Sequence, residues 1–252
     1  MSKFFVKSNQ INNDEIKILG TDVNHIKNVL RLSIGNEINI CNEETSVNYT
    51  AKIDKLEKDY IICKIEKVVN LSVETNVDIT IFQGLPKADK MELIIQKSTE
   101  LGANRFVPVA FKRCIVKLNE KDEKKKIERW QKISEVAAKQ SGRDIIPPIE
   151  KIKTIEDIKS EIKDYNLFLV AYEQEKNLSL KEVLKTFKSD SNKIKIAILI
   201  GPEGGLEESE VEQMKEAGAK IITLGKRILR TETVALSMTS ILMYELENLK
   251  GE

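Results

Sequence analysis

The sequence predicts an α/β fold in which a mostly parallel β-sheet lies between layers of helices, preceded by a smaller β-rich unit. Strand-like and helix-like segments alternate from residue 77 onward, which is the order found in parallel sheets. Residues 196–200 are a short, uninterrupted run of mostly β-branched apolar side chains, as expected of a strand covered on both faces. Before residue 70, short apolar segments follow one another with a single helical segment among them.

Residues 1–72 are expected to form a separate small β-barrel. A helix at 23–32 interrupts its strands, and His25, Val29 and Leu32 share one face of that helix. This face is therefore expected to pack on the barrel. The predicted strands are short and are separated by turns rich in Asn, Asp, Gly and Glu; they lie at 4–6, 16–19, 37–41, 47–53 and 60–69.

Residues 73–252 are expected to form a larger second domain, which begins in a polar linker. Ser179 and Glu182 form an S-x-x-E capping box at the start of one helix. The last helix, which carries apolar side chains as far as Leu249, has so broad an apolar surface that it needs its own sheet or another subunit as a partner. Strands are predicted at 77–82, 105–109, 166–171, 196–200 and 221–224, and helices at 88–101, 122–140, 154–163, after Ser179, before Gly218 and from Glu232 to Asn248.

Composition limits the possible functions. The formal net charge is only +1, so a nucleic-acid partner requires a local basic surface. The three cysteines are isolated in the sequence, which indicates reduced structural thiols, and a single histidine disfavours Ser-His catalysis and multi-histidine metal sites. We therefore expect no metal. No apolar run is long enough to span a membrane, and the N-terminus lacks the apolar core of a signal peptide, so we expect a cytoplasmic protein without a membrane partner.

Two loops after neighbouring predicted strands form the candidate binding site. The loop 201–205 is rich in glycine and the loop 225–230 carries two arginines, and open α/β sheets usually bind their ligands where such loops meet. A nucleotide phosphate cradle is disfavoured, because Glu203 lies within the first loop and three more glutamates crowd the start of the next helix. The spacing also differs from G-x-G-x-x-G. Taken alone, the first loop also suits an ordinary turn before an acid-capped helix.

The segments GPEGG (201–205), LGKRILRTET (224–233) and VALSM (234–238) form a long and specific combination. They resemble the RsmE family of the SPOUT class, whose members methylate N3 of a uridine in 16S ribosomal RNA with S-adenosylmethionine. The resemblance covers nearly the whole chain. It implies a SPOUT domain at 73–252 with a trefoil knot in its C-terminal part, a PUA-like RNA-binding barrel at 1–72, and a homodimer. The implied partner is 16S rRNA or the assembled 30S subunit.

The resemblance also implies which residues bind the cofactor S-adenosylmethionine. They follow three of the predicted strands, and most of the contacts are expected to involve the backbone. The implied residues are Ala171, Tyr172, Glu173, Ile200, Gly201, Pro202, Glu203, Gly204, Gly205, Leu224, Gly225, Ile228, Leu229, Arg230, Thr231 and Thr233.

Catalysis requires a deprotonated uridine. N3 of uridine is a weakly acidic imide, so the enzyme must help it to lose a proton and must stabilise the charge that remains. Our hypothesis is that Arg230, helped by Lys87 or Arg113, supplies positive potential. By resemblance, the segment KADKMELIIQKSTELG places Lys87 and Glu100 near the reacting centre. Glu100 and Glu203 are the available carboxylates, and the sequence does not identify the base. A cationic sulfonium tolerates Glu203 nearby, whereas a pyrophosphate does not.

Several cationic side chains are candidates for RNA contact. The segment HIKNVLRLSIGNEI resembles the family's H-x-x-x-V-L-R pattern, which suggests His25 and Arg31, although His25 equally suits a buried, hydrogen-bonded imidazole. By the same resemblance, Arg113, Arg129 and Arg143 lie near the RNA, and arginine is the scarcer cation in this lysine-rich chain. The neighbouring lysines 124–126 are interpreted as a solvated helix face.

Two other functions stay open at this point. A SPOUT enzyme that acts on transfer RNA or on a ribose hydroxyl is disfavoured by the N-terminal barrel and by the RILRTET segment. A non-catalytic RNA-binding protein of the same fold is disfavoured by the intact loops at 201–205 and 224–230.

Overall fold

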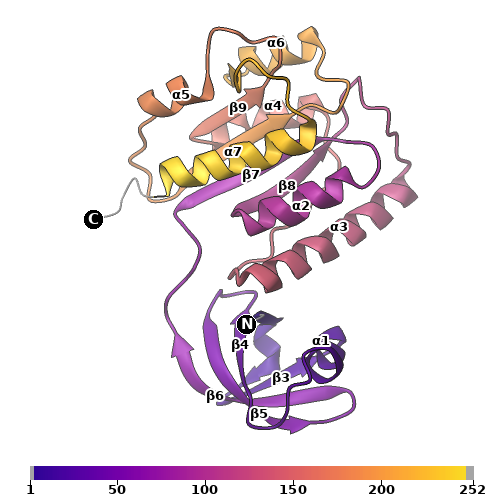
Figure 1. Ribbon diagram of the computed structural model, residues 1–252, viewed down its shortest axis with the longest axis vertical. Coiled ribbons are helices and arrows are strands. Elements are labelled where there is room, and N and C mark those ends of the chain that lie inside the picture. Colours follow the sequence, from indigo (N-terminus) through magenta and orange to yellow (C-terminus); the bar gives the residue numbers. More distant parts are fainter. Residues whose placement is uncertain (1–2, 248–252) are drawn as a thin grey trace. The chain divides into compact units, whose positions relative to one another are not determined.

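The computed structural model describes residues 3–247, which belong to two compact units (Figure 1). Unit 1 consists of Met1–Glu74 and Ala138–Ile146, and unit 2 of Thr75–Ala137 and Pro147–Glu252. The expected end of the last helix, Asn248, and the apolar Leu249 lie outside the described residues. No helix within 3–247 is both long enough and apolar enough to cross a membrane.

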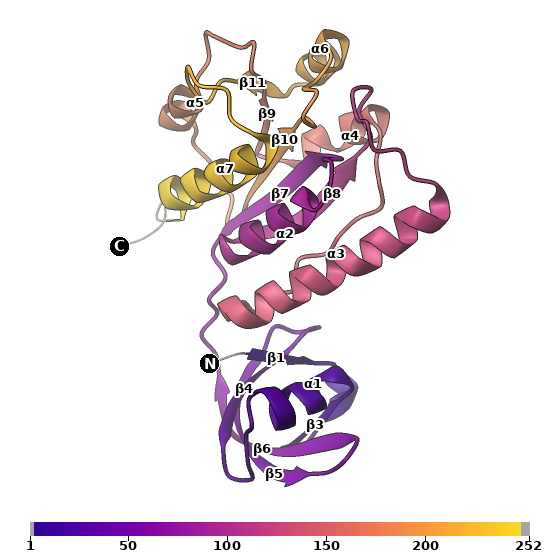
Figure 2. The ribbon, with the colours of Figure 1, turned by 45° about the vertical axis from the view of Figure 1, so that its right-hand side comes forward.

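Unit 1 is built on one bent sheet. Its strands are β1 (Lys3–Val6), β2 (Ile11–Asn12), β3 (Glu15–Leu19), β4 (Glu37–Asn42), β5 (Asn48–Leu56) and β6 (Tyr60–Val69). The six-stranded sheet has the order β1-β4-β5-β6-β3-β2, in which only β1 and β4 are parallel. Figure 2 shows it curving around the core of the unit, which contains the fully buried Ile16, Ile40 and Ile61. The sequence pattern predicts all of these strands except the two-residue β2.

The helical segment of unit 1 differs from expectation. The helix α1 (Thr21–Asn24) continues as a π-helical turn, η2 (His25–Val29). Val23 and Ile26 pack on the sheet and are 4% and 0% exposed, whereas Val29 is 63% exposed. The prediction that Val29 belongs to the packing face is therefore wrong, because a π-helical turn shifts the residues that follow it away from the periodicity of an α-helix.

Asp144 holds the second segment of unit 1 against its sheet. The carboxylate of Asp144 is fully buried and is paired with the ammonium group of Lys3. It also accepts hydrogen bonds from Nδ2 of Asn48 at 2.9 Å, from Oγ of Ser72 at 2.7 Å and from the backbone N–H of Val73 at 2.8 Å. Burial by itself would raise the pKa of Asp144, but these donors, with Lys3 first, outweigh it and lower the pKa below its usual value.

Arg143, the neighbour of Asp144, has a structural role. It is 5% exposed, its guanidinium is paired with the carboxylate of Glu74, and its Nε donates to Oε1 of Glu74 at 3.1 Å. The same Oε1 accepts the backbone N–H of Asp144 at 2.9 Å. A buried and paired guanidinium is a poor phosphate ligand, and contact of Arg143 with RNA stays a prediction.

Unit 2 contains a parallel sheet, as the alternating pattern predicts. Its strands are β7 (Val77–Gly84), β8 (Ala103–Val109), β9 (Leu167–Ala171), β10 (Ile194–Ile200) and β11 (Lys220–Ile222). The five-stranded sheet has the order β11-β9-β10-β7-β8, and each neighbouring pair is parallel. The carboxyl ends of β9, β10 and β7 therefore meet at one edge of the sheet. The trefoil knot stays a prediction.

Helices cover both faces of this sheet. They are α2 (Lys90–Glu100), α3 (Glu120–Ser141), α4 (Ile155–Glu161), α5 (Leu180–Thr186), α6 (Glu208–Glu216) and α7 (Thr231–Leu246). The last residues of α3, from Ala138 onward, belong to unit 1. In the view of Figure 1, α7 lies in front of the strands beside α2, and α4 lies behind them near α6. The predicted capping box at Ser179 and Glu182 is confirmed.

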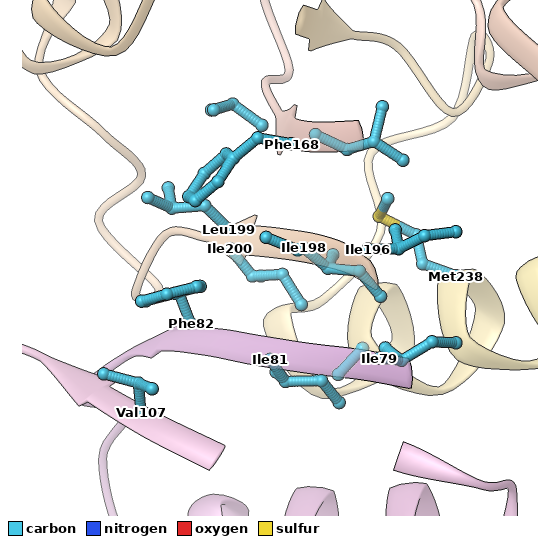
Figure 3. Packing of buried hydrophobic residues seen from close by; sticks show 14 of the residues in the cluster. Ile79, Ile81, Phe82, Val107, Phe168, Ile196, Ile198, Leu199, Ile200 and Met238 are labelled. Atoms are coloured by element: carbon cyan, nitrogen blue, oxygen red, sulfur yellow. The ribbon is translucent and has the colours of Figure 1, made fainter. Parts of the chain in front are cut away.

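The core of unit 2 explains why its strands are apolar along their whole length. Figure 3 shows side chains of β7 and β10, among them Ile81 and Ile198, packed with Phe168 of β9 and Met238 of α7. Ile81, Ile198 and Met238 are completely buried. Burying an isoleucine of this kind stabilises the fold by roughly 2 kcal/mol. Because both faces are covered, the strands alternate little between apolar and polar side chains.

Candidate functional site

A cavity of about 380 Å³ lies at the carboxyl ends of β9 and β10 in unit 2. Three chain segments that are far apart in the sequence form its walls: the residues after β9, the glycine loop after β10, and the loop that joins β11 to α7. Its lining residues are Lys90, Ala171, Tyr172, Glu173, Ile200, Gly201, Pro202, Glu203, Gly205, Leu206, Thr223, Leu224, Gly225, Lys226, Arg227, Ile228, Leu229, Arg230, Thr231 and Val234.

The glycine loop is packed too closely for larger residues. Gly205 has a φ of +70°, in the left-handed region that favours glycine. A Cβ atom on Gly205 would lie 3.0 Å from Oε1 of Glu173. A Cβ atom on Gly84, at the end of β7, would lie 2.6 Å from the backbone nitrogen of Pro202. The glycines therefore allow the ends of β7 and β10 and the residues after β9 to approach one another around the cavity.

Glu203 ties the glycine loop to the start of α2. Its Oε1 lies 2.8 Å from Nζ of Lys90, and its carboxylate accepts the backbone N–H of Lys87 at 3.1 Å. The same Lys90 ammonium lies 3.5 Å from Oε2 of Glu232, in the first turn of α7. One cation thus joins α2, the glycine loop and α7 beside the cavity.

The charges of this ion pair are stable near neutral pH. Partial burial would raise the pKa of Glu203, but the hydrogen bonds from Lys90 and from backbone N–H groups outweigh burial and lower it. The hydrogen bond to Glu203 raises the pKa of Lys90, and the charge of Glu232 acts in the same direction. Glu203 is therefore held ionised, which makes it a weak proton acceptor.

A chain of hydrogen bonds fixes the start of α7 beside the cavity. The amide Nε2 of the fully buried Gln83 donates to Oγ1 of Thr231 at 2.8 Å, and Thr231 donates to the backbone oxygen of Gly201 at 2.8 Å. Gln83 lies on β7, Gly201 follows β10, and Thr231 is the first residue of α7. The chain therefore determines where Arg230, the residue before Thr231, enters the cavity wall.

A buried glutamate holds Arg113 at the edge of the glycine loop. Glu210 is 3% exposed, and its carboxylate accepts the backbone N–H groups of Lys112 and Glu207, both at 2.9 Å. Arg113 follows Lys112 in the sequence, and its guanidinium donates from Nη1 to the backbone oxygen of Gly204 at 3.3 Å. The turn after β8 is thus fixed against the start of α6, with the exposed Arg113 beside the cavity.

The structure brings most of the predicted cofactor residues together around this one cavity. Gly204 and Thr233 do not line it: Gly204 faces Arg113, and Thr233 is exposed on α7. Sequence reasoning missed Lys90, Leu206, Thr223, Lys226, Arg227 and Val234. For most of these the signal was available, because they lie next to predicted site residues in the same two loops.

Two predicted catalytic residues lie elsewhere. Glu100 is at the last position of α2 and pairs with Lys97 at 2.9 Å, on the order of 15 Å along the helix from Lys90. Glu100 therefore does not line the cavity, and its role near the reacting centre stays a prediction. Lys87 contributes its backbone N–H to Glu203, but its side chain is exposed and does not line the cavity, whereas that of Lys90 does.

The remaining RNA candidates are dispersed over the two units. In unit 1, the partly buried His25 ring lies edge-on to Phe4 with the ring centroids 6.1 Å apart, and Arg31 is exposed with a φ of +53°. In unit 2, the exposed Arg129 on α3 pairs with Glu92 of α2 at 2.8 Å. Contact of His25, Arg31, Arg113 and Arg129 with RNA stays a prediction.

The cysteines are unsuited to nucleophilic chemistry. All three are buried and free, and burial, followed by the charge of Asp144, raises the pKa of Cys41 to about 11. Burial raises the pKa of Cys63 to about 12 and that of Cys114 above its usual value. Within 3–247, no three His, Cys, Asp or Glu side chains come close enough together to hold a metal ion.

Comparison with known proteins relates this arrangement to a family. Residues 73–243 match an RNA methyltransferase domain, and residues 18–66 match an RNA methyltransferase PUA domain. The chain is 36% identical to ribosomal RNA small subunit methyltransferase E of Bacillus subtilis, with both chains covered completely. The chain belongs to the ribosomal RNA small subunit methyltransferase E family. A further member, from Mesomycoplasma hyopneumoniae, is 32% identical over 94% of this chain and 96% of its own.

Solved structures of similar proteins share the architecture. A methyltransferase E from Neisseria gonorrhoeae, bound to S-adenosylmethionine, superposes with a TM-score of 0.84 at 29% identity and covers 97% of each chain. A methyltransferase from Legionella pneumophila, in complex with the same cofactor, has a TM-score of 0.84 at 26% identity and covers 96% of each chain. The fold of this family member is therefore that of SPOUT-type RNA methyltransferases preceded by a PUA domain.

Proposed function

We propose that this chain transfers the methyl group of S-adenosylmethionine to N3 of a uridine in the 16S RNA of the small ribosomal subunit. The observation that carries the proposal is the cavity, because its walls are the glycine loop and the β11–α7 loop, the same segments whose sequence resembles the RsmE family. Membership of the methyltransferase E family and the cofactor-bound relatives support it. The substrate is 16S rRNA, either free or within the 30S subunit, in the cytoplasm.

The cavity suits S-adenosylmethionine in size and charge. Its volume of about 380 Å³ lies in the range of small-molecule sites. Apolar side chains such as Leu206, Leu224 and Val234 provide walls for an adenine ring, and the carboxylates of Glu173 and Glu203 favour a cationic sulfonium over a phosphate. The residues present therefore fit the cofactor. When bound, it supplies an electrophilic methyl group.

The protein's task is to bind the uridine in its anionic form. The exposed Arg230 lies in the cavity wall at the amino end of α7, where the dipole of that helix adds positive potential. This potential lowers the pKa of the N3 imide and stabilises the charge on its flanking oxygens, so that solvent takes the proton. Arg113, held by Gly204, adds a second positive charge at the edge of the site. Glu203 remains paired with Lys90 and serves to position the loop.

We also propose that two copies of the chain pair through α2 and α7. These helices lie side by side, and apolar side chains remain exposed on both of them. Leu93 on α2 and Leu101 just after it are 42% and 38% exposed, and Ile241 and Tyr244 on α7 are 41% and 80% exposed. An apolar surface of this kind is typical of an interface with a partner subunit.

A methyl-transfer assay tests the proposed function. Small ribosomal subunits that lack the modification are incubated with labelled S-adenosylmethionine, and the product nucleoside is identified by mass spectrometry. The expected product is N3-methyluridine. Arg230→Ala should lower the rate about 100- to 1,000-fold, the typical loss when one donor that stabilises a developing charge is removed.

Two controls make the assay specific. Arg230→Lys keeps the charge and should retain part of the activity, and Lys195→Ala removes an exposed charge at the opposite end of β10 and should have no effect. A different methylated nucleoside would contradict the substrate, and cofactor binding without transfer to any RNA would contradict the enzymatic function.

A further inference from the structure

The tip of the β11–α7 loop carries cations that the cofactor site does not require. Lys226 and Arg227 are exposed at the rim of the cavity, and Ile228 after them is 83% exposed. Figure 2 shows this loop running from β11 to the start of α7. With Arg230, the tip presents three positive charges within five residues.

Both ends of this loop are fixed. At its beginning, Oγ1 of Thr223 accepts the backbone N–H of Gly225 at 3.2 Å and lies 3.4 Å from the backbone oxygen of Gly225. At its end, Thr231 is held between Gln83 and Gly201 by the chain of hydrogen bonds described above. The tip is therefore presented from two anchored ends, which lowers the entropic cost of binding a ligand there.

The cations of the tip have no acidic partners. In the part of the chain that the structure describes, Lys226, Arg227 and Arg230 form no side-chain hydrogen bond or ion pair, whereas Lys90 at the same cavity is paired with Glu203. Uncompensated cations at one rim create a local positive potential in a chain whose net charge is only +1. Such a surface is suited to an anion that arrives from solvent.

We propose that Lys226 and Arg227 bind phosphate groups of the RNA strand on either side of the target uridine, with Ile228 in contact with a neighbouring base or ribose. This inference rests on the proposed function and names a contact of its substrate. RNA phosphates suit this site better than the cofactor does, because a small ligand has most of its surface buried in its pocket. The tip, in contrast, is exposed at the mouth of the cavity.

The salt dependence of RNA binding tests this inference. The variant Lys226→Ala/Arg227→Ala is compared with the wild type in binding and methylation of small ribosomal subunits that lack the modification. Each phosphate contact on single-stranded RNA contributes about 0.7 to the slope of log K against log salt concentration. Between about 50 and about 200 mM salt, the RNA affinity of the wild type should therefore fall about sevenfold more than that of the variant. The KM for RNA should rise by more than kcat falls.

A matched control removes two positive charges from another part of the surface. Lys193→Ala/Lys195→Ala changes two exposed lysines at the opposite end of β10 and should keep the salt slope of the wild type. Affinity for S-adenosylmethionine is measured by calorimetry for each protein. In the variant that lacks Lys226 and Arg227, this affinity should change by less than about threefold.

The outcomes separate this inference from the function on which it rests. A wild type that methylates 16S rRNA, together with a tip variant of unchanged salt slope and unchanged KM for RNA, would overturn the inference and leave the function intact. A loss of cofactor affinity as large as the rise in KM would also overturn it, because the cations would then bind the carboxylate of the cofactor. A wild type that binds the cofactor but methylates no ribosomal RNA would overturn both.

Discussion

The ammonium group of Lys90 lies 2.8 Å from Oε1 of Glu203 and 3.5 Å from Oε2 of Glu232. Glu203 belongs to the glycine loop, and Glu232 to the first turn of α7. Oε2 of Glu232 is buried and accepts no hydrogen bond among the described residues, so Lys90 is its compensating charge. Lys90 therefore determines how two walls of the cavity meet.

Lys90→Met should impair the site without unfolding the protein. The variant leaves two carboxylates close together without a cation, and their repulsion should separate the glycine loop from α7. We expect kcat/KM to fall roughly 10- to 100-fold, with weaker binding of S-adenosylmethionine, measured by steady-state kinetics and calorimetry. Lys90→Arg, which keeps the charge, should retain part of the kcat/KM and part of the affinity for S-adenosylmethionine.

Lys87→Met separates the roles of the two lysines. It removes an exposed side chain and keeps the backbone N–H that Glu203 accepts, so it should be much less harmful than Lys90→Met. An equal loss in both variants would assign a catalytic role to the Lys87 side chain. Normal kinetics in Lys90→Met would contradict the positioning role of Lys90.

Gly205→Ala tests the close packing of the glycine loop. The substitution strains a backbone with a φ of +70° and brings the new Cβ to 3.0 Å from Oε1 of Glu173, which lines the cavity. We expect a loss of roughly 1 to 2 kcal/mol of stability, measured by urea unfolding. Cofactor affinity should fall at least about tenfold, since a displaced loop misplaces its contacts.

Gly218→Ala is the matched control for the backbone strain. Gly218 has a φ of +105°, and its Cβ would meet only Ile162, at 3.9 Å. This variant should lose similar stability and keep its affinity for S-adenosylmethionine. If both glycine variants lose affinity equally, the effect comes from general destabilisation rather than from the contact with Glu173.

The sequence predicts the strands and the glycine loop, because these depend on the local order of residues. The strands and the glycine loop follow from β-branched runs and from residues that end them, so their positions are close to those of the structure. Glu203 could be placed in the site because it lies within the loop itself. Which of Lys87 and Lys90 faces the cavity could not be predicted, since it depends on where α2 begins. The helix begins at Lys90 rather than at residue 88, where the sequence predicts its start.

Long-range pairing could not be predicted either. The partner of the buried Arg143 is Glu74, which is 69 residues away, and nothing near either residue indicates the pair. The position of Glu100 outside the cavity lining could not be predicted for a different reason: Glu100 belongs to the same helix as Lys90, but lies at the other end of that helix. The π-helical turn at His25 likewise arises from packing and has no sequence periodicity of its own.

Tyr244→Glu tests the pairing of two copies through α2 and α7. An unpaired charge buried within an apolar interface is costly, so the variant should be monomeric where the wild type is dimeric. Light scattering after size exclusion should give twice the chain mass of 28.7 kDa for the wild type and that mass for the variant. Val136→Glu, which alters an exposed side chain on α3, should stay dimeric. A monomeric wild type at micromolar concentration would contradict the interface.

Asp144 should make unit 1 sensitive to acid. The pKa of Asp144 is lowered in the folded state, so its stabilising effect is present above the pKa of the unfolded chain, about 3.9, and is lost as the pH falls through the folded pKa. Asp144→Asn should lower the free energy of unfolding by roughly 2 to 4 kcal/mol at neutral pH, because the partly buried ammonium group of Lys3 loses its charged partner. The variant should also show a smaller decline of stability below about pH 4. Urea unfolding between about pH 3 and about pH 6, followed by hydrogen exchange of peptides from 37–69, measures both effects. Glu15→Gln, on an exposed position of β3, is the control. If the free energy of unfolding falls with pH equally in Asp144→Asn and in the wild type, this carboxylate does not hold the segment 138–146 against the sheet.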